Sequence, residues 1–351
     1  MNSASISNVP AGLASHLQDA YGLEITSIAV VPKGEDADAY RATASDGEQY
    51  FVRVEPGRTG DQLEVALAAA ATLRDHCGLT CIVGSLPTTQ GTFTSRLAAS
   101  TVAVFPFVDG TTAYDRSISE PDWSRLATMM AALHTHETLS GASALPRETF
   151  ANPFAATIRH AVQRAATMDA WPSSLQEMAA ELLLAHRADI EQFMRQFEHL
   201  GERCRNLSPE LVVTHGDPNL SNVLLDDAGT LWLIDWGGLG LGPRERDLFA
   251  FTGDRFAGFL ETYLDRAGPV RLHLDLFDFY AIRWVLQEIA DYSSHLLIAP
   301  AEAEAQAHAW RELQPYLPIP HAALAADRDA VHLALAPFVR SGLVTVIPPT
   351  P

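Results

Sequence analysis

The feature that most constrains this chain is the segment His215–Asn222, HGDPNLSN, which is followed at once by two short apolar runs. The runs cover residues 223–225 and 231–235, and the residues between them, DDAGT at 226–230, have the composition of a hairpin turn. Two apolar runs joined by such a turn predict a pair of antiparallel strands. The segment His215–Asn222 is then the loop that enters this hairpin.

The register of the hairpin decides which polar side chains meet. If residue 225 pairs with residue 231, Asn222 lies beside Asp235 at one end of the hairpin. Amide and carboxylate oxygens are ligands that suit Mg²⁺ bound to phosphate oxygens. Asp217 is not needed as a ligand and can accept a proton from a hydroxyl nucleophile, so the stretch predicts phosphoryl transfer. The alternative is an ordinary surface hairpin, because Asp and Asn flank many such turns.

The order Asp, Asn, Asp across this hairpin matches the catalytic-loop logic of protein kinases. The sequences HGDPNLSNVLL and LIDWGGLGLGPRERDLFAF resemble the aminoglycoside phosphotransferase family, which shares its fold with choline kinases. GPRERDLFAF and the later FYAIRWVLQEIADYSSHLL look most like spectinomycin phosphotransferase-type enzymes. The resemblance implies an α+β, bilobal protein-kinase-like fold with a β-rich N-lobe and a mainly helical C-lobe.

The resemblance also implies roles for single residues. Asp217 would be the catalytic base, Asn222 and Asp235 the Mg²⁺ ligands, and His215 and Asp247 structural residues near the site. ATP or GTP would be bound by Arg53, Glu64, Gly34, Phe105, Phe107 and Val108. Arg53 stands where the fold carries a phosphate-binding lysine, and Glu64 would orient it by an ion pair.

Each nucleotide-binding assignment has a structural alternative. Arg53 can be a strand arginine that reaches solvent, and Glu64 suits a helix N-terminus in any protein. The turn that holds Gly34 has no second glycine and can be an ordinary hairpin. The apolar segment 101–110 ends in proline and glycine, which suits either a hinge whose backbone and aromatic side chains bind adenine or a core strand.

Periodicity and turn residues indicate a β-rich first third and a mainly α-helical remainder. With this pattern the resemblance implies an N-terminal nucleotide-binding lobe (1–104), a hinge (105–110), a C-terminal catalytic and substrate-binding lobe (111–340) and a tail (341–351). Two further strands are expected at Cys81–Leu86 and Gly91–Leu97. A long helix is expected over 272–297. It carries four carboxylates that are tentative ligands for substrate ammonium groups, with a solvated helix face as the alternative: Asp275, Asp278, Glu288 and Asp291.

Charge and composition restrict the partners. The 351 residues carry a net charge of −19, which disfavours nucleic acid and anionic membranes and favours a cationic small molecule. Three cysteines without paired spacing argue against a disulfide framework. No apolar run approaches the roughly 20 residues that span a bilayer. We therefore expect a cytoplasmic monomer or homodimer.

These observations predict an ATP- or GTP-dependent O-phosphotransferase. The best candidate acceptor is an aminoglycoside or aminocyclitol such as spectinomycin, which the reaction would inactivate. A metabolic kinase for choline, homoserine, a methylthio-sugar or a macrolide is the nearest alternative. A non-catalytic pseudokinase that only binds its ligand is a further one, favoured by the arginine at position 53 and the poor glycine loop.

Overall fold

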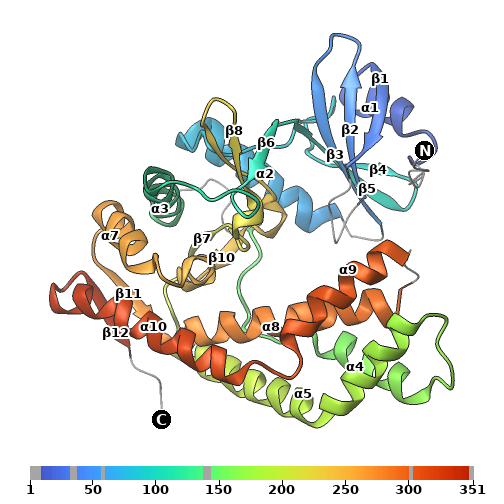
Figure 1. Ribbon diagram of the computed structural model, residues 1–351. Coiled ribbons are helices and arrows are strands. Elements are labelled where there is room, and N and C mark those ends of the chain that lie inside the picture. Colours follow the sequence, from blue (N-terminus) through green and yellow to red (C-terminus); the bar gives the residue numbers. More distant parts are fainter. Residues whose placement is uncertain (1–8, 32–37, 57–59, 137–143, 300–302, 348–351) are drawn as a thin grey trace. The chain divides into compact units, whose positions relative to one another are not determined.

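The computed structural model describes residues 9–31, 38–56, 60–136, 144–299 and 303–347 (Figure 1). Gly34, a predicted nucleotide-binding residue, lies outside this part of the chain. The chain forms two compact units. The first comprises Met1–Arg147, Leu211–Gly242 and Asp265–Ala267, and the second comprises Glu148–Glu210, Pro243–Leu264 and Gly268–Pro351. These units divide the chain differently from the predicted lobes, since the hairpin that follows Asn222 groups with the N-terminal sheet.

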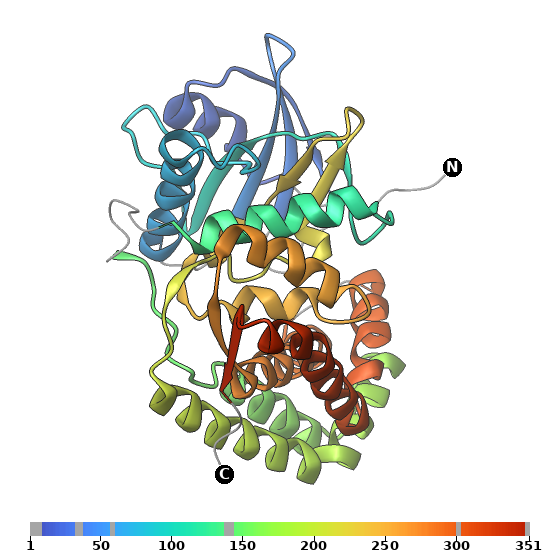
Figure 2. The same ribbon diagram turned by 90° about the vertical axis from the view of Figure 1, so that its left-hand side faces the viewer.

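The first unit is built on a five-stranded antiparallel sheet with strand order β1-β2-β3-β5-β4. Its strands are β1 (Ile25–Val30), β2 (Asp38–Ala44), β3 (Gln49–Pro56), β4 (Ser95–Leu97) and β5 (Ser100–Pro106). Helix α1 (Leu13–Tyr21) places Leu13 and Leu17 in one buried cluster with Val52 and Val104 (Figure 2, blue). The helices α2 (Gly60–Cys77) and α3 (Glu120–His134) belong to the same unit.

The predicted strand pair at 81–86 and 91–97 is mostly wrong. Residues 81–86 are extended, but they bond to two different partners, with the Leu233 N–H donating to Cys81 O and the Leu86 N–H donating to Val104 O. Of the second run only Ser95–Leu97 is a strand. The residues before it are held by side chains instead, since Glu64 accepts hydrogen bonds from Phe93 and Thr94.

The second unit is mainly helical. Its helices are α4 (Ala155–Thr167), α5 (Ser174–Leu207), α6 (Glu245–Leu248), α7 (Phe256–Ala267, whose last residues cluster with the first unit), α8 (Leu274–Leu297), α9 (Ala303–Leu313) and α10 (His321–Arg340), with 3₁₀ turns at Phe249–Phe251 and Gln314–Tyr316. Helices α4, α5, α8 and α9 share one apolar core, in which the ring of Phe197 stacks on Phe279 with 4.6 Å between centroids. None of the helices in the described ranges is long and apolar enough to cross a membrane.

Part of the predicted tail, residues 344–347, forms a strand. Strand β12 (Val344–Ile347) pairs in parallel with β11 (Val270–His273). Val344 is 2% exposed, because it packs inside the unit. In a tail this side chain would be exposed to water. The first residues of the predicted helix 272–297 likewise belong to β11, and α8 begins at Leu274.

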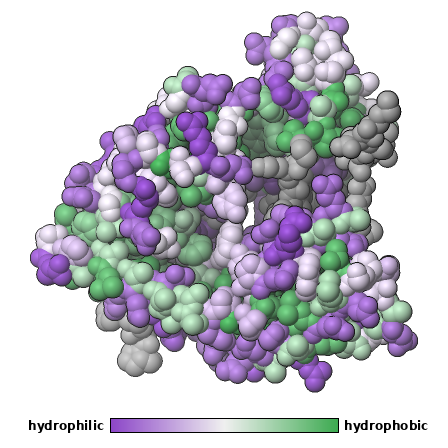
Figure 3. Space-filling model, viewed as in Figure 1, coloured by the Kyte–Doolittle hydropathy of each residue, from purple (hydrophilic) through white to green (hydrophobic). Residues whose placement is uncertain are grey.

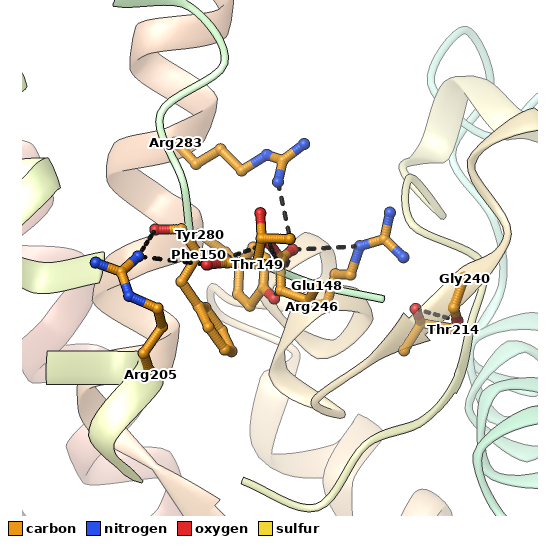
Figure 4. A network of polar contacts seen from close by, with 9 residues as sticks. All are labelled: Glu148, Thr149, Phe150, Arg205, Thr214, Gly240, Arg246, Tyr280 and Arg283. Atoms are coloured by element: carbon orange, nitrogen blue, oxygen red, sulfur yellow. Dashed lines mark hydrogen bonds and ion pairs between the residues drawn. The ribbon is translucent and has the colours of Figure 1, made fainter. Parts of the chain in front are cut away.

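Polar contacts hold the first residues of the second unit (Figure 4). Oε1 of Glu148 accepts hydrogen bonds from the main-chain N–H groups of Thr149 and Phe150, both at 2.9 Å. Its Oε2 lies 3.2 Å from the hydroxyl of Tyr280 and 3.4 Å from Nη1 of Arg283. Glu148 is therefore a structural anchor that orders the main chain at this point.

Hydrophilic residues (purple) are spread over the face of the molecule seen in Figure 3, as expected for a chain with a net charge of −19.

Candidate active site

The hairpin that follows Asn222 forms in the predicted register. Strands β8 (Val223–Asp226) and β9 (Leu231–Leu233) pair with Leu225 opposite Leu231, and β6 (Gly110–Thr112) adds a third strand beside β8. The N–H of Ile234 donates to the main-chain oxygen of Asn222 at 3.0 Å, which places Asn222 next to Asp235. The hairpin therefore brings these two side chains to one end, inside the first unit.

Asp217 is held by two amide side chains. Its Oδ1 accepts from Nδ2 of Asn219 at 2.7 Å, and its Oδ2 accepts from Nδ2 of Asn222 at 3.0 Å. Burial raises the pKa of Asp217, while His215 and the two amides oppose the rise. A carboxylate with a raised pKa and a fixed orientation is suited to accept a proton from a bound hydroxyl group.

His215 holds the loop that carries Asp217 in place. It is fully buried, its Nδ1 accepts from the N–H of Asp217 at 3.3 Å, and its Nε2 lies 2.9 Å from the main-chain oxygen of Ile234. Its ring also contacts that of Trp236 edge-on, with 4.5 Å between centroids. His215 thus links the loop that carries Asp217 to the strand end that carries Asp235.

Asp235 is paired with a cation from the N-terminal sheet. Its Oδ1 lies 2.5 Å from Nη1 of Arg53. Nε of Arg53 lies 2.8 Å from Oε1 of Glu55, which is two residues along the same strand and therefore on the same face. Asp235 adopts a left-handed conformation, φ 58° and ψ 62°, which Asp tolerates better than most residues and which turns its side chain away from the strand.

The predicted ion pair between Arg53 and Glu64 does not form. Both carboxylate oxygens of Glu64 accept the N–H of Phe93, and Oε2 also accepts the N–H and hydroxyl of Thr94 at 2.7 Å. Glu64 therefore orders the turn before β4, and among the described residues Glu55 and Asp235 take its place beside Arg53.

The predicted hinge residues lie in and just after β5. Phe105 is 9% exposed and packs near Phe51 of the neighbouring strand, whereas Phe107 and Val108 are half-buried. The guanidinium of Arg41 lies over the ring of Phe107, 4.4 Å from its centroid. Phe105 is thus a core residue of the sheet. Of the three hinge residues predicted to bind nucleotide, Phe107 and Val108 have exposed surface with which to contact the nucleobase.

The four carboxylates of α8 belong to the second unit and differ in their surroundings. Asp275 is buried and bound by Arg203, with Nη2 3.0 Å from its Oδ1, and Asp278 lies 2.8 Å from Nε of Arg328. These two pairs occupy the carboxylates inside the protein, so Asp275 and Asp278 are not presented to a ligand in this structure.

The remaining predicted residues are Glu288, Asp291 and Asp247. Glu288 is 8% exposed and hydrogen-bonds Tyr316, whereas Asp291 is half-exposed. Asp247 is fully buried in α6 of the second unit, as a structural carboxylate would be.

Sequence reasoning missed two residues of the site. Asn219 orients Asp217 and also caps the 3₁₀ turn Leu220–Asn222 through the N–H of Ser221. Glu55 balances the charge of Arg53. The spacing of Glu55 from Arg53 was a usable signal, because residues two apart on a strand share a face.

The donor atoms at the end of the hairpin fit Mg²⁺. The amide nitrogen of Asn222 donates to Asp217, so its amide oxygen remains to coordinate a metal ion. Arg53 pairs with Oδ1 of Asp235, so Oδ2 of Asp235 remains as a second metal ligand. Mg²⁺ needs only one or two protein oxygens when phosphate oxygens and water complete its shell. The described residues contain no cluster of three or more His, Cys, Asp or Glu for a metal held by protein alone.

Comparisons with known proteins identify the family. Residues 27–284 match the model of the phosphotransferase enzyme family (APH). Protein StrN of Streptomyces griseus is 30% identical over 317 residues, which cover 86% of this chain and 89% of that protein.

Two solved structures show the fold. A spectinomycin phosphotransferase in complex with ADP and spectinomycin superposes with a TM-score of 0.71 at 19% identity, over 91% of this chain and 98% of that one. A microcompartment-associated aminopropanol kinase gives 0.53 at 18% identity, over 94% and 98% of the two chains. The fold is thus the protein-kinase-like fold of small-molecule phosphotransferases. From its family match and its relative, this chain belongs to the phosphotransferase enzyme family (APH) and is a phosphotransferase with an alcohol group as acceptor.

Proposed function

We propose that this protein transfers the γ-phosphoryl group of ATP or GTP to a hydroxyl group of a cationic small molecule, with an aminoglycoside or aminocyclitol such as spectinomycin as the first candidate. The observation that carries the proposal is the joint placement of Asp217, Asn222 and Asp235 at one hairpin, with Arg53 on Asp235. All four residues belong to the first unit.

The proposed chemistry assigns one task to each side chain. Asp217 accepts the proton of the acceptor hydroxyl as its oxygen attacks the γ-phosphorus, and the nucleoside diphosphate leaves from the opposite side. Arg53 donates hydrogen bonds to the phosphates that stay on the nucleotide. Asn222 and Asp235 would hold Mg²⁺, which neutralises phosphate charge. Asn219 and His215 keep Asp217 in position.

The charge of the chain and the acceptors of its structural neighbours support a cationic acceptor. A net charge of −19 attracts ammonium groups at long range. Spectinomycin is bound in one neighbouring structure, and the name of another gives aminopropanol as its substrate. An amino alcohol of primary metabolism is therefore the second candidate acceptor. Within α8, Asp291 is the first candidate for its ammonium group, because Asp275 and Glu288 are buried and Asp278 lies against Arg328.

The test is Mg²⁺-dependent nucleotide consumption by the purified protein across a panel of acceptors. The panel contains spectinomycin, 4,6-linked aminoglycosides, hygromycin, aminopropanol, ethanolamine, choline and homoserine, with ATP and GTP compared. We expect one amine-bearing acceptor to stimulate turnover, and Asp291→Asn to raise its KM more than Asp278→Asn does. Nucleotide binding without stimulation by any acceptor would reject the acceptor class, and absence of nucleotide binding would favour a pseudokinase.

Arg53→Gln is expected to weaken nucleotide binding by about 10- to 100-fold, because a hydrogen bond to a charged group contributes about 1.5–3 kcal/mol. Arg96→Gln is the matched control, since Arg96 lies in the same sheet and binds Thr101 and the main-chain oxygen of Ala99. Displacement of a fluorescent nucleotide from both variants measures the effect. Equal affinities would remove Arg53 from the nucleotide site.

A further inference from the structure

The second unit contains a cavity of about 450 Å³ that has no part in the proposed reaction. It is lined by residues from the end of α5, the start of α6, strand β11 and Thr345 of β12. Its volume lies within the range of about 300–1,000 Å³ that is usual for small-molecule pockets. The side chains that line it are mostly polar, which suits a ligand that carries charge.

His273 supplies a buried polar atom without a partner. The residue is 7% exposed, and its main-chain N–H donates to Oε1 of Glu245 at 2.6 Å. The ring atom Nδ1 is buried, yet it forms no hydrogen bond with any residue that the structure describes. A buried polar atom without a hydrogen bond lowers the stability of the folded protein, so a ligand atom in the cavity that bonds to Nδ1 would be favourable.

Arg271 adds a positive charge beside this ring. Arg271 and His273 are two residues apart on β11 and therefore share a face, where Thr345 is the register partner of Arg271. Arg271 is exposed, and within the described ranges its guanidinium forms no hydrogen bond or ion pair. Burial, and then the charge of Arg271, lower the pKa of His273, while Asp275 opposes the shift.

The other charged groups of the cavity are already engaged. Nη1 of Arg244 lies 2.7 Å from Oε2 of Glu210, while its Nε is buried and makes no hydrogen bond to a described residue. Glu245 is buried, its Oε1 accepts the main-chain N–H of His273, and burial raises its pKa to about 7. The guanidinium of Arg271, the ring of His273 and Nε of Arg244 are therefore the groups left to bind a ligand in this part of the structure.

We propose that this cavity binds the oxyanion group, a carboxylate or a phosphate, of a small molecule, with Arg271 and His273 as its donors. A guanidinium matches either group with two parallel hydrogen bonds, and an imidazole N–H can supply a third. None of the residues that line the cavity is one to which the proposed phosphoryl transfer assigns a task.

The test is isothermal titration calorimetry of the whole protein at pH 6.5 with two probes, inorganic phosphate and malonate. We expect at least one probe to bind, and Arg271→Gln to weaken that binding by about tenfold or more. His273→Gln should also weaken binding, because it removes the imidazole ring. It keeps the hydrogen bond from the main-chain N–H to Glu245. Arg311→Gln, an equal change of charge at an exposed position of α9 outside the cavity, should leave binding unchanged.

The outcomes separate the possible sources of binding. Binding of phosphate alone assigns a phosphate ester as the ligand class, and binding of malonate alone assigns a carboxylate. Binding that Arg53→Gln abolishes and Arg271→Gln leaves intact belongs to the nucleotide site and overturns the proposal. Failure of both probes to bind, or equal effects of Arg271→Gln and Arg311→Gln, also overturns it.

Discussion

Asp217→Asn is expected to lower kcat by about 10²- to 10⁴-fold, the usual contribution of general-base assistance, with the KM for nucleotide almost unchanged. The substitution keeps the size of the side chain and one acceptor for the two amides that hold Asp217. It removes the negative charge, the ability to take a proton and one of the two acceptor oxygens. Steady-state phosphorylation of the acceptor found in the panel, with nucleotide varied, measures both constants.

Asp227→Asn is the matched control, because Asp227 lies in the exposed turn of the same hairpin. Its kcat should stay within about twofold of the native value, as surface substitutions usually have little effect. If Asp217→Asn retained more than about a tenth of native kcat, proton transfer to this carboxylate would not be a major contribution to the rate.

Asp235→Asn is expected to reduce kcat by about 10²- to 10³-fold, a loss typical for the removal of one electrostatic group at a reacting centre. Asn adopts the left-handed conformation of Asp235 as readily as Asp does, so the loop should keep its course. The variant loses the carboxylate that we propose as a Mg²⁺ ligand and that pairs with Arg53. The Mg²⁺ concentration for half-maximal nucleotide binding should therefore rise.

Two controls keep this result interpretable. Circular dichroism and the melting temperature should match those of the native protein, because the side chain of Asp235 is 39% exposed and its ion pair contributes little to folding. Activity that falls while the Mg²⁺ dependence of nucleotide binding stays unchanged would contradict a ligand role for Asp235.

The hairpin and its register were predictable because they depend on local signals. The turn composition at 226–230 and the apolar runs on either side of it favour the pairing of Leu225 with Leu231, and that pairing brings Asn222 to Asp235. Helix α8 was recognisable for a similar reason, since a helical pattern over 24 residues leaves little ambiguity.

Contacts between distant segments were not predictable in the same way. Glu64 has equally good partners in Arg53 and in the main chain at Phe93, and only the folded turn before β4 decides between them. Asp275 and Asp278 share a helix face, but their partners Arg203 and Arg328 come from α5 and α10. Sequence spacing could place these carboxylates on a face without showing that the face was already occupied.

Strand β12 makes the last residues of the chain necessary for the order of an earlier segment. Because β12 pairs in parallel with β11, cutting the chain before Val344 would leave β11 with an unpaired edge and uncover Val270, which is 7% exposed. Open strand edges invite association between copies of a protein. A shortened chain would therefore be prone to aggregate even though every residue of the hairpin site was intact, and a loss of activity in it would report on folding and not on chemistry.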